Sequence, residues 1–261
     1  MSVVGLGCNA FGARVDADTA KAVVDAALDQ GVTLFDTADV YGEGASEALL
    51  GEALGSQRAD VVVATKFGHD AYEVRTSTWG ARGSRRYIRR SVEASLQPLG
   101  TDWIDLYQIH VPDPVTPIDE TLAALGQLVA EGKVRYVGSS NFAAWQVVDA
   151  DWTARTSGYT RFVSAQSKYS LYDRSAEADL VPACEHTGVG MLPYFPLEYG
   201  LLTGKYRRDE AAPAGSRLAT QRARLQSADF DRIEALERFA TGRGVGILDV
   251  ALEDASPGAH P

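Results

Sequence analysis

The stretch Thr33–Tyr41 reads Thr-Leu-Phe-Asp-Thr-Ala-Asp-Val-Tyr, and the fold prediction starts from it. An apolar, β-prone run stops at Asp36, and a polar segment continues to Tyr41 before a helical pattern at Glu47–Leu54. A buried strand that ends in polar side chains just before a helix is typical of parallel α/β folds. Asp36 alone could equally be a turn or helix cap, and Tyr41 alone would ordinarily be a half-buried loop aromatic. The strands that follow decide between these interpretations.

Two further predicted strands end in titratable residues. Asp60–Phe67 is an apolar run rich in β-branched residues, which indicates a strand buried on both faces, and it carries Lys66 near its end. Ile104–Ile109 is the next strand, and His110 follows it directly. Lys66 alone could simply extend its ammonium group out at the strand end. Three such residues in a row instead predict one shared site, because the carboxyl ends of barrel strands lie on one face.

The remainder of the chain continues the alternation of strands and helices. A helix capped by Asp18 is expected after the first strand, and a helix capped by Ser84 after the third. A long loop is expected over Phe195–Gln226. Strict alternation predicts a parallel sheet, and its evenness favours a (β/α)8 TIM-type barrel in one domain over residues 1–261. The other predicted strands are Val3–Gly7, Val32–Phe35, Val134–Gly138, Phe162–Gln166 and Val189–Tyr194.

Composition limits the classes of partner. The chain has 261 residues and a net charge of −10, which argues against nucleic acid or an anionic membrane as partner. Cys8 and Cys184 form neither a disulfide framework nor a metal-binding spacing, which favours a reducing compartment. With no basic leader and no apolar run approaching about 18 residues, the sequence predicts a soluble cytoplasmic protein. The arginines at 82, 85, 86, 89 and 90 are interpreted as a solvated helix face.

The residues at the strand ends suit carbonyl chemistry. A phenol, with a reference pKa of about 10, is a poor proton donor at neutral pH. A nearby Lys66 ammonium would favour the phenolate of Tyr41, and Asp36 would hold that ammonium in place. His110 could hydrogen-bond and orient a carbonyl oxygen. Together these groups could protonate an oxygen while a second molecule delivers a hydride.

Several longer motifs resemble the aldo-keto reductases, which are β/α barrels that reduce carbonyl compounds with NADPH. They include Phe-Asp-Thr-Ala-Asp-Val-Tyr-Gly, Ala-Thr-Lys, Asp-Leu-Tyr-Gln-Ile-His, Gly-Lys-Val-Arg-Tyr-Val-Gly-Ser-Ser-Asn-Phe and Pro-Leu-Glu-Tyr-Gly-Leu-Leu-Thr-Gly-Lys. The resemblance runs from Val3 to about Leu252 and is strongest to the bacterial branch that also resembles potassium-channel β subunits.

The resemblance implies roles for particular residues. The catalytic tetrad would be Asp36, Tyr41, Lys66 and His110, with Tyr41 as the general acid and base. Ser140, Asn141 and Gln166 would hold the nicotinamide carboxamide, Tyr194 would stack on the ring, and Lys205 would supply charge beside the pyrophosphate. Tyr72 and Trp79 would line the pocket of a small carbonyl substrate. The remaining residues implied at the NADPH site are Cys8, Asn9, Phe195, Pro196 and Leu197.

The sequence also departs from the family pattern. Phe195 stands where a serine is usual, so one phosphate contact is expected to be made by backbone alone or lost. The tail from residue 247 to 261 begins like a helix and then lacks a strand pattern, so the barrel is expected to be incomplete. Weak NADPH binding and marginal stability are therefore expected, unless Arg217 or the pair Arg207 and Arg208 holds the 2′-phosphate.

Three functions remain open from the sequence. The first is NADPH-dependent reduction of an aldehyde or ketone. The second is a non-catalytic homologue that binds cofactor weakly or serves as a partner protein. The third is a Schiff-base aldolase that uses Lys66, which barrels also support but which gives Asp36 and Tyr41 no clear role.

Overall fold

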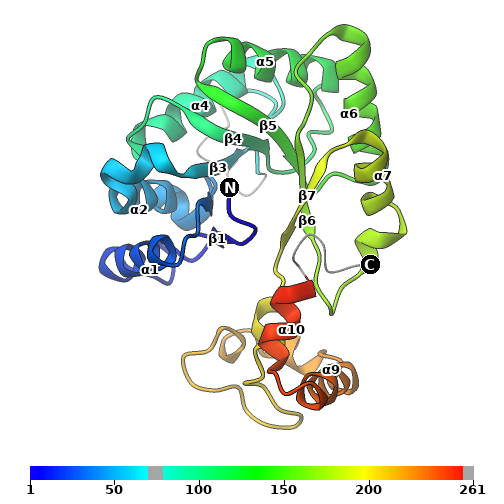
Figure 1. Cartoon of the computed structure of the whole chain (residues 1–261). Coiled ribbons are helices and arrows are strands. Elements are labelled where there is room, and N and C mark those ends of the chain that lie inside the picture. Colours follow the sequence, from blue (N-terminus) through cyan, green and yellow to red (C-terminus); the bar gives the residue numbers. More distant parts are fainter. Residues whose placement is uncertain (70–78, 255–261) are drawn as a thin grey trace. The chain divides into compact units, whose positions relative to one another are not determined.

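The computed structural model describes residues 1–69 and 79–254 (Figure 1). The chain divides into two compact units, of which the first comprises Met1–Gln166 and Leu180–Met191. The second comprises Ser167–Asp179 and Leu192–Pro261. A single domain over the whole chain stays a prediction.

Seven parallel strands form one sheet, in the order in which they occur along the chain. This arrangement confirms the predicted α/β class and corresponds to an incomplete (β/α)8 barrel, with seven of its strands within the described residues. The strands are β1 (Gly5–Gly7), β2 (Leu34–Asp36), β3 (Val62–Phe67), β4 (Ile104–Ile109), β5 (Val134–Ser140), β6 (Ser164–Lys168) and β7 (Gly190–Tyr194).

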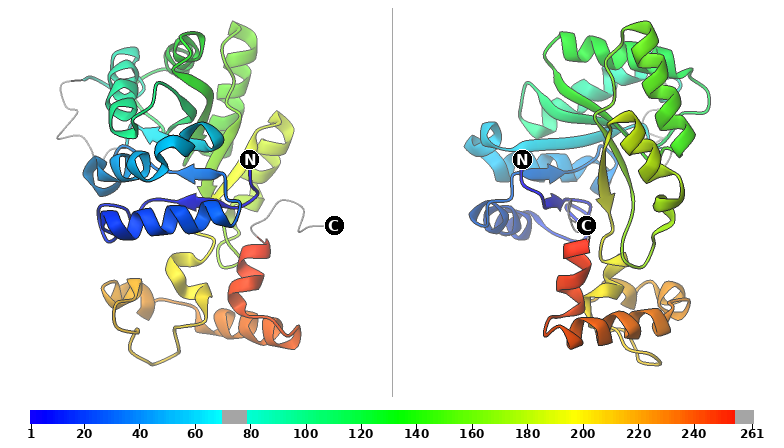
Figure 2. Two further views of the ribbon diagram at one scale, coloured as in Figure 1. Left: turned by 60° about the vertical axis from the view of Figure 1, so that its left-hand side comes forward. Right: turned by 45° about the vertical axis from the view of Figure 1, so that its right-hand side comes forward.

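The helices of the first unit cover the outer face of the curled sheet, as Figure 1 and the two views of Figure 2 show. They are α1 (Ala17–Asp29), α2 (Ala45–Leu54), α4 (Arg85–Leu99), α5 (Ile118–Ala130), α6 (Ala144–Ser157) and α7 (Leu180–Thr187). The second unit contains α8 (Arg222–Gln226), α9 (Phe230–Gly242) and α10 (Ile247–Asp254). Short 3₁₀ helices complete the fold, namely η1 (Tyr41–Gly44), η2 (Gly55–Asp60), η4 (Ser175–Ala178), η5 (Glu198–Thr203) and η6 (Arg217–Ala219).

Strand register places the polar strand-end residues on one face of the sheet. Asp36 pairs with Ala64, which lies two residues before Lys66. Lys66 in turn pairs with Gln108, two residues before His110. Side chains that pair directly, or that lie two residues apart on one strand, point to the same side of a sheet. Asp36, Lys66 and His110 therefore face the inside of the sheet, opposite the helices.

Capping explains where two of the helices begin. Ser84 caps α4 as predicted, because its hydroxyl accepts a hydrogen bond from the backbone N–H of Tyr87. The predicted cap of α1 was wrong by two positions. Asp16, in extended conformation, accepts from the N–H of Thr19, while Asp18 lies in the first turn of the helix. Both aspartates suit the positive end of the helix dipole, so the sequence alone did not separate them.

The predicted long loop over Phe195–Gln226 is also corrected. It contains η5, η6 and the short helix α8. These elements have six residues or fewer, so none is long enough to show an apolar helical period.

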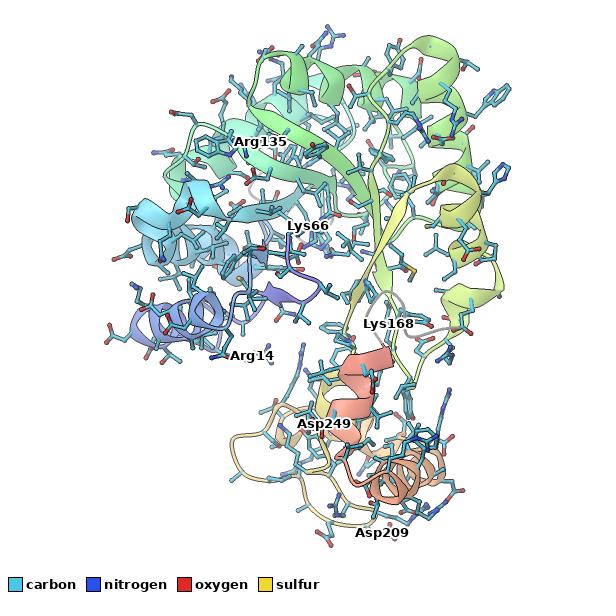
Figure 3. All side chains as sticks on the ribbon, viewed as in Figure 1. Arg14, Lys66, Arg135, Lys168, Asp209 and Asp249 are labelled. Carbon is cyan, nitrogen blue, oxygen red and sulfur yellow. The ribbon has the colours of Figure 1, made fainter. Side chains whose placement is uncertain are left out.

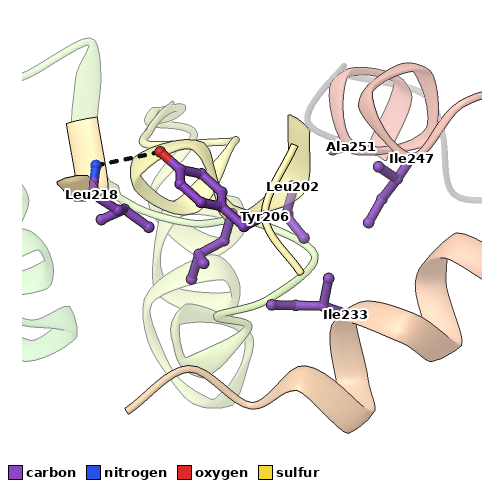
Figure 4. Packing of buried hydrophobic residues seen from close by; sticks show 7 residues of the cluster. Leu202, Tyr206, Leu218, Ile233, Ile247 and Ala251 are labelled. Carbon is purple, nitrogen blue, oxygen red and sulfur yellow. Dashed lines mark hydrogen bonds between the residues drawn. The ribbon is translucent and has the colours of Figure 1, made fainter. Parts of the chain in front are cut away.

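The second unit has a hydrophobic core of its own. Residues from η5, η6, α9 and α10 pack together, and the hydroxyl of Tyr206 accepts a hydrogen bond from the backbone N–H of Leu218 over 3.3 Å (Figure 4). Aromatic hydroxyls in a core need such a partner. The cluster consists of Leu201, Leu202, Tyr206, Leu218, Ile233, Ile247 and Ala251.

A cluster of charged side chains lies at the amino ends of the strands in the first unit. The buried carboxylate of Asp105 binds Arg58 at 2.8 Å and Arg135 at 2.7 Å. The two guanidinium groups lie 4.8 Å and 4.9 Å from the ring centroid of Trp103, whose indole N–H also donates to Asp105. Arg58 is buried, whereas Arg135 is 54% exposed (Figure 3). Asp105 thus pairs with two cations at the end opposite to the polar strand ends.

The arginines of α4 lie where the sequence predicts a solvated helix face. Arg85, Arg86, Arg89 and Arg90 are exposed, and Arg89 pairs with Glu131 at 2.6 Å, whereas Arg82 precedes the helix and is half-buried. In the part of the chain that the structure describes, no helix combines the length and apolar character needed to cross a bilayer.

Candidate active site

Lys66 is the centre of the predicted tetrad. Its ammonium lies 2.7 Å from Oδ2 of Asp36 and donates a second hydrogen bond, of 2.9 Å, to the backbone oxygen of Thr37. The Lys66 side chain is 1% exposed and that of Asp36 is 20% exposed. Burial lowers the pKa of Lys66, but the attraction of Asp36 and Tyr41 outweighs it, so the pKa is raised. Lys66 is therefore an ammonium at neutral pH.

Tyr41 begins the 3₁₀ turn η1 just beyond β2. Left-handed backbone at Gly42 and Glu43, with φ of 55° and 57°, turns the chain back so that α2 can start at Ala45. The Lys66 ammonium lies 5.1 Å from the centroid of the Tyr41 ring. Burial raises the pKa of Tyr41 and outweighs the opposing effect of Lys66. The phenol is therefore protonated at neutral pH, although the sequence led us to expect the ammonium to favour the phenolate.

His110 lies against the ring of Tyr41. The ring centroids are 5.7 Å apart at an interplanar angle of 84°. Burial and, to a smaller extent, the charges of Lys66 and His69 lower the pKa of His110 to about 2. Its Nδ1 is buried and has no hydrogen-bond partner within the described residues. A neutral imidazole has one N–H donor and one acceptor nitrogen, so it can hydrogen-bond an uncharged oxygen without an ionisation step.

His69 is a neighbour of the site that the sequence reasoning missed. It follows β3 and Gly68, and its ring centroid lies 4.6 Å from that of His110 at an angle of 71°. Gly68 has a left-handed φ of 81°, which a residue with a side chain would adopt only with strain. The available signal was position, because a polar residue just beyond a barrel strand tends to face the functional side.

Two of the residues implied at the cofactor, Gln166 and Asn141, donate side-chain hydrogen bonds to the tetrad, and a third, Ser140, bonds to Asn141. Gln166 donates from Nε2 to Oδ1 of Asp36 over 3.1 Å. Asn141 donates from Nδ2 to the backbone oxygen of His110 over 2.9 Å and to Oγ of Ser140 over 3.1 Å. Asn141 has a left-handed φ of 59°, a conformation that asparagine tolerates better than most residues. Amide and hydroxyl groups at neighbouring strand ends fit a carboxamide, which needs both donors and acceptors.

Cys8 and Asn9 follow β1 beside the same site. The backbone N–H of Cys8 donates a hydrogen bond to the backbone oxygen of Asp36 over 2.8 Å. The thiol of Cys8 is fully buried, and burial together with the charge of Asp36 raises its pKa. Cys8 is therefore a neutral packing residue whose polar contact with Asp36 is made by backbone, while Asn9 is half-buried.

The other five residues implied at the cofactor lie in the second unit, namely Tyr194, Phe195, Pro196, Leu197 and Lys205. Phe195 has a left-handed φ of 57°, and its ring lies 5.1 Å from the ring of Tyr194 and 4.3 Å from that of Tyr199. The guanidinium of Arg217 lies over Phe195 and Tyr199 at 5.1 Å and 4.8 Å. The exposed cation Lys205 and the half-buried cation Arg217 each fit the charge of a phosphate.

Arg207 and Arg208, which the sequence offered as alternative phosphate ligands, already have acidic partners. Arg207 pairs with Glu237 at 2.9 Å, and Arg208 pairs with both Glu234 and Asp231. The hydrogen bonds to these acids raise the pKa of Arg208. A phosphate would have to compete with these carboxylates.

Of the two residues implied in the substrate pocket, the structure describes Trp79. Trp79 is half-buried before α4, and its ring lies 5.6 Å from that of Tyr87 at an angle of 68°. Its contact with substrate stays a prediction. Tyr72 lies outside the described residues.

The parallel sheet of an incomplete β/α barrel thus brings a tyrosine, a lysine, an aspartate and a histidine together at its strand ends. The model of the Aldo/keto reductase family matches residues 3–253, and the chain belongs to this family. The resemblance noted from the sequence motifs is thereby confirmed.

Curated relatives cover most of the chain. It is 40% identical to the uncharacterized oxidoreductase YrpG of Bacillus subtilis over 86% of this chain and 72% of that protein. Identity to aflatoxin B1 aldehyde reductase member 4 of Homo sapiens is 34%, over 98% of this chain and 75% of that protein. Identity to a probable voltage-gated potassium channel subunit beta of Oryza sativa is 32%, over 93% of this chain and 75% of that protein. Family membership and the names of the first two relatives support a general oxidoreductase function.

Proposed function

We propose that this chain reduces an aldehyde or ketone to an alcohol, with NADPH as hydride donor and Tyr41 as general acid. The observation that carries the proposal is the placement of Lys66, which binds Asp36 at 2.7 Å and lies 5.1 Å from the centroid of the Tyr41 ring. A buried ammonium in contact with a phenol stabilises the phenolate that remains after proton donation. Lys66 has no comparable reason to be buried in a purely structural barrel, because burying a charge is costly.

Proton donation by Tyr41 follows from its protonation state. Its raised pKa keeps the proton on the phenol at neutral pH, where the group is ready to donate. Lys66 acts at the next moment, because its charge stabilises the oxygen from which the proton has left. Asp36 keeps Lys66 charged and fixed through this change.

His110 has a different role in the proposal. Its lowered pKa keeps the imidazole neutral, so the ring can donate a hydrogen bond to the carbonyl oxygen without competing for the proton of Tyr41. The ring contact with Tyr41 at 5.7 Å brings both groups to one side of the site. A carbonyl oxygen between them would be oriented and polarised before the proton moves.

The residues fit the cofactor that the family generally binds. Ser140, Asn141 and Gln166 would hold the carboxamide of the nicotinamide, and Tyr194 would stack on its ring. Lys205, with Arg217, would bind phosphate. When bound, the nicotinamide supplies the hydride that the side chains of the protein cannot supply. A substrate class of aldehydes agrees with the name of the human relative, which is called an aldehyde reductase.

The Schiff-base alternative is disfavoured by the state of Lys66. A nucleophilic lysine needs a lowered pKa, so that some of it is neutral amine at working pH. The pKa of Lys66 is raised, and its ammonium already donates hydrogen bonds to Asp36 and Thr37.

The test combines binding with turnover. NADPH and NADH are each titrated by quenching of tryptophan fluorescence, and oxidation of the reduced cofactor is then followed with a panel of aldehydes and ketones. We expect saturable NADPH binding and carbonyl-dependent oxidation that Tyr41→Phe removes. Binding without turnover on any carbonyl would favour the non-catalytic alternative. Carbonyl trapping on Lys66 by borohydride would favour the aldolase.

A further inference from the structure

Each charged residue of the Asp36–Lys66 pair has a threonine beside it in the sequence. Thr37 follows Asp36, and Thr65 precedes Lys66. Side chains alternate along a strand, so Thr65 points to the helix side of the sheet while Lys66 points inward. Both threonines are fully buried, and both hydroxyls bond to consecutive residues of α2.

The first bond joins Thr37 to Ser46. The Ser46 hydroxyl donates to the backbone oxygen of Cys8 over 2.9 Å. A hydroxyl has one proton, so the 2.8 Å contact between Oγ1 of Thr37 and Oγ of Ser46 must have Thr37 as donor. Ser46 therefore ties the segment after β1 to the segment after β2.

The second bond joins Thr65 to Glu47. The hydroxyl of Thr65 donates to Oε1 of Glu47 over 2.6 Å, and Glu47 is 2% exposed. A short bond from a hydroxyl to a carboxylate oxygen inside a protein is strong and directional. Ser46 and Glu47 thus connect the first turn of α2 to the strand ends that carry Asp36 and Lys66.

The same turn is joined directly to Tyr41. Only Gly42, Glu43 and Gly44 separate Tyr41 from Ala45, where α2 begins. Apolar packing would hold α2 against the sheet but would allow it to slide along the strands. Directional bonds to Thr37 and Thr65 remove that freedom. A slide of α2 would move Tyr41 relative to Lys66.

We propose that Thr37 and Thr65, through Ser46 and Glu47 of α2, are positioning residues that set the distance between Tyr41 and the Lys66 ammonium. The inference rests on the proposed function, because that distance matters for proton donation by Tyr41. None of the four residues needs to touch the substrate or the cofactor. Their effect is transmitted through the placement of α2.

The experiment uses isosteric substitutions in the full chain. Thr37→Val and Thr65→Val each remove one hydroxyl at nearly constant volume. Thr37→Ser and Thr65→Ser keep it. Loss of either bond should let Tyr41 move away from Lys66 and so raise the apparent pKa of Tyr41 by about 0.5–1 unit. Turnover should fall by about 10- to 100-fold in kcat, with little change in the KM for carbonyl substrate.

The matched control is Thr187→Val. Thr187 is also buried, and its hydroxyl donates to the backbone oxygen of Ala183 over 2.8 Å near the end of α7. That end of the helix leads back to the start of β7, so it lies away from the strand ends that carry Lys66. We expect Thr187→Val to lower Tm as the other valine variants do but to leave the pKa of Tyr41 unchanged.

Two readouts separate failure of this inference from failure of the proposed function. The pH dependence of kcat reports Tyr41 when the chain turns over a carbonyl. The phenolate absorbance difference between each variant and the same variant carrying Tyr41→Phe reports Tyr41 without any activity. A raised Tyr41 pKa in both valine variants, restored in the serine variants, supports the positioning role. A lowered Tm with an unchanged Tyr41 pKa overturns it, whether or not the chain reduces carbonyls.

Discussion

Gln166 donates a hydrogen bond to the carboxylate oxygen of Asp36 that Lys66 does not bind. Gln166 Nε2 lies 3.1 Å from Oδ1, and Lys66 Nζ lies 2.7 Å from Oδ2. The carboxylate is therefore fixed at both oxygens. A residue proposed to hold the nicotinamide also fixes the partner of the ammonium, so cofactor binding and the state of Tyr41 should be linked.

Replacing Gln166 by methionine should weaken this link. The variant keeps the side-chain length but loses the donor to Asp36, at a cost of about 1–3 kcal/mol of unfolding free energy, because hydrogen bonds to charged groups are the stronger ones. Urea unfolding measures the change. An unaltered unfolding midpoint would show that the 3.1 Å contact contributes nothing.

Tyr41→Phe should remove carbonyl reduction and leave nicotinamide binding nearly intact. The phenol acts on the substrate oxygen, and a general acid contributes about 10²–10⁴-fold to the rate. Turnover and cofactor titration are measured on the same preparation. Unchanged turnover would exclude Tyr41 as the acid.

Lys66→Met should act through Tyr41 and Asp36 together. Loss of the ammonium removes the group that lowers the pKa of Tyr41, so that pKa should rise further. Asp36 would lose its cation in a site where Lys66 is fully buried, at a cost of up to about 3–5 kcal/mol, reduced by the partial exposure of Asp36. The pH–rate profile and the melting temperature are the measurements. If both stay at their wild-type values, the ion pair does not couple to Tyr41.

His110 should make stability fall as the pH drops below about 6.5, the usual range of histidine. Its folded pKa is lowered to about 2, so between these values the unfolded chain binds a proton that the folded chain does not. The contribution is at most about 1.4 kcal/mol per pH unit for this one proton. His110→Gln should flatten the acid side of a plot of Tm against pH. His186→Gln, at an exposed position on α7, is the control, and an equal flattening there would contradict the assignment to His110.

The two arginines that share Asp105 should respond very differently to substitution. Arg58→Met breaks a buried pair and should cost about 3–5 kcal/mol. Arg135→Met removes a cation that is 54% exposed and should cost about 1 kcal/mol or less. Both variants should keep wild-type turnover per folded molecule, because the cluster lies at the amino ends of the strands. Equal losses of stability would show that the exposure of each arginine does not determine its contribution to the free energy of unfolding.

The sequence predicted the strand ends well because their signal is local. β4 matches its predicted span of Ile104–Ile109, and Asp36, Lys66 and His110 meet as the strand-end pattern indicated. Quantities that depend on packing were harder to predict from the sequence. The pKa of Tyr41 reflects a balance between burial and Lys66, and no spacing of residues reports burial depth. His69 was missed because it belongs to none of the motifs used, although it follows the end of β3 much as His110 follows the end of β4.

The strand register limits where residues can be inserted or deleted. Inserting or deleting one residue early in β3 would exchange the sides taken by Lys66 and Thr65, which would send the ammonium toward α2 and a hydroxyl toward the interior. A change of two residues would restore the side but move Lys66 along the strand, away from Asp36. Natural and engineered length variation should therefore be confined to the connections between strands and helices, and an alignment that places a gap inside β2, β3 or β4 should be treated as an error.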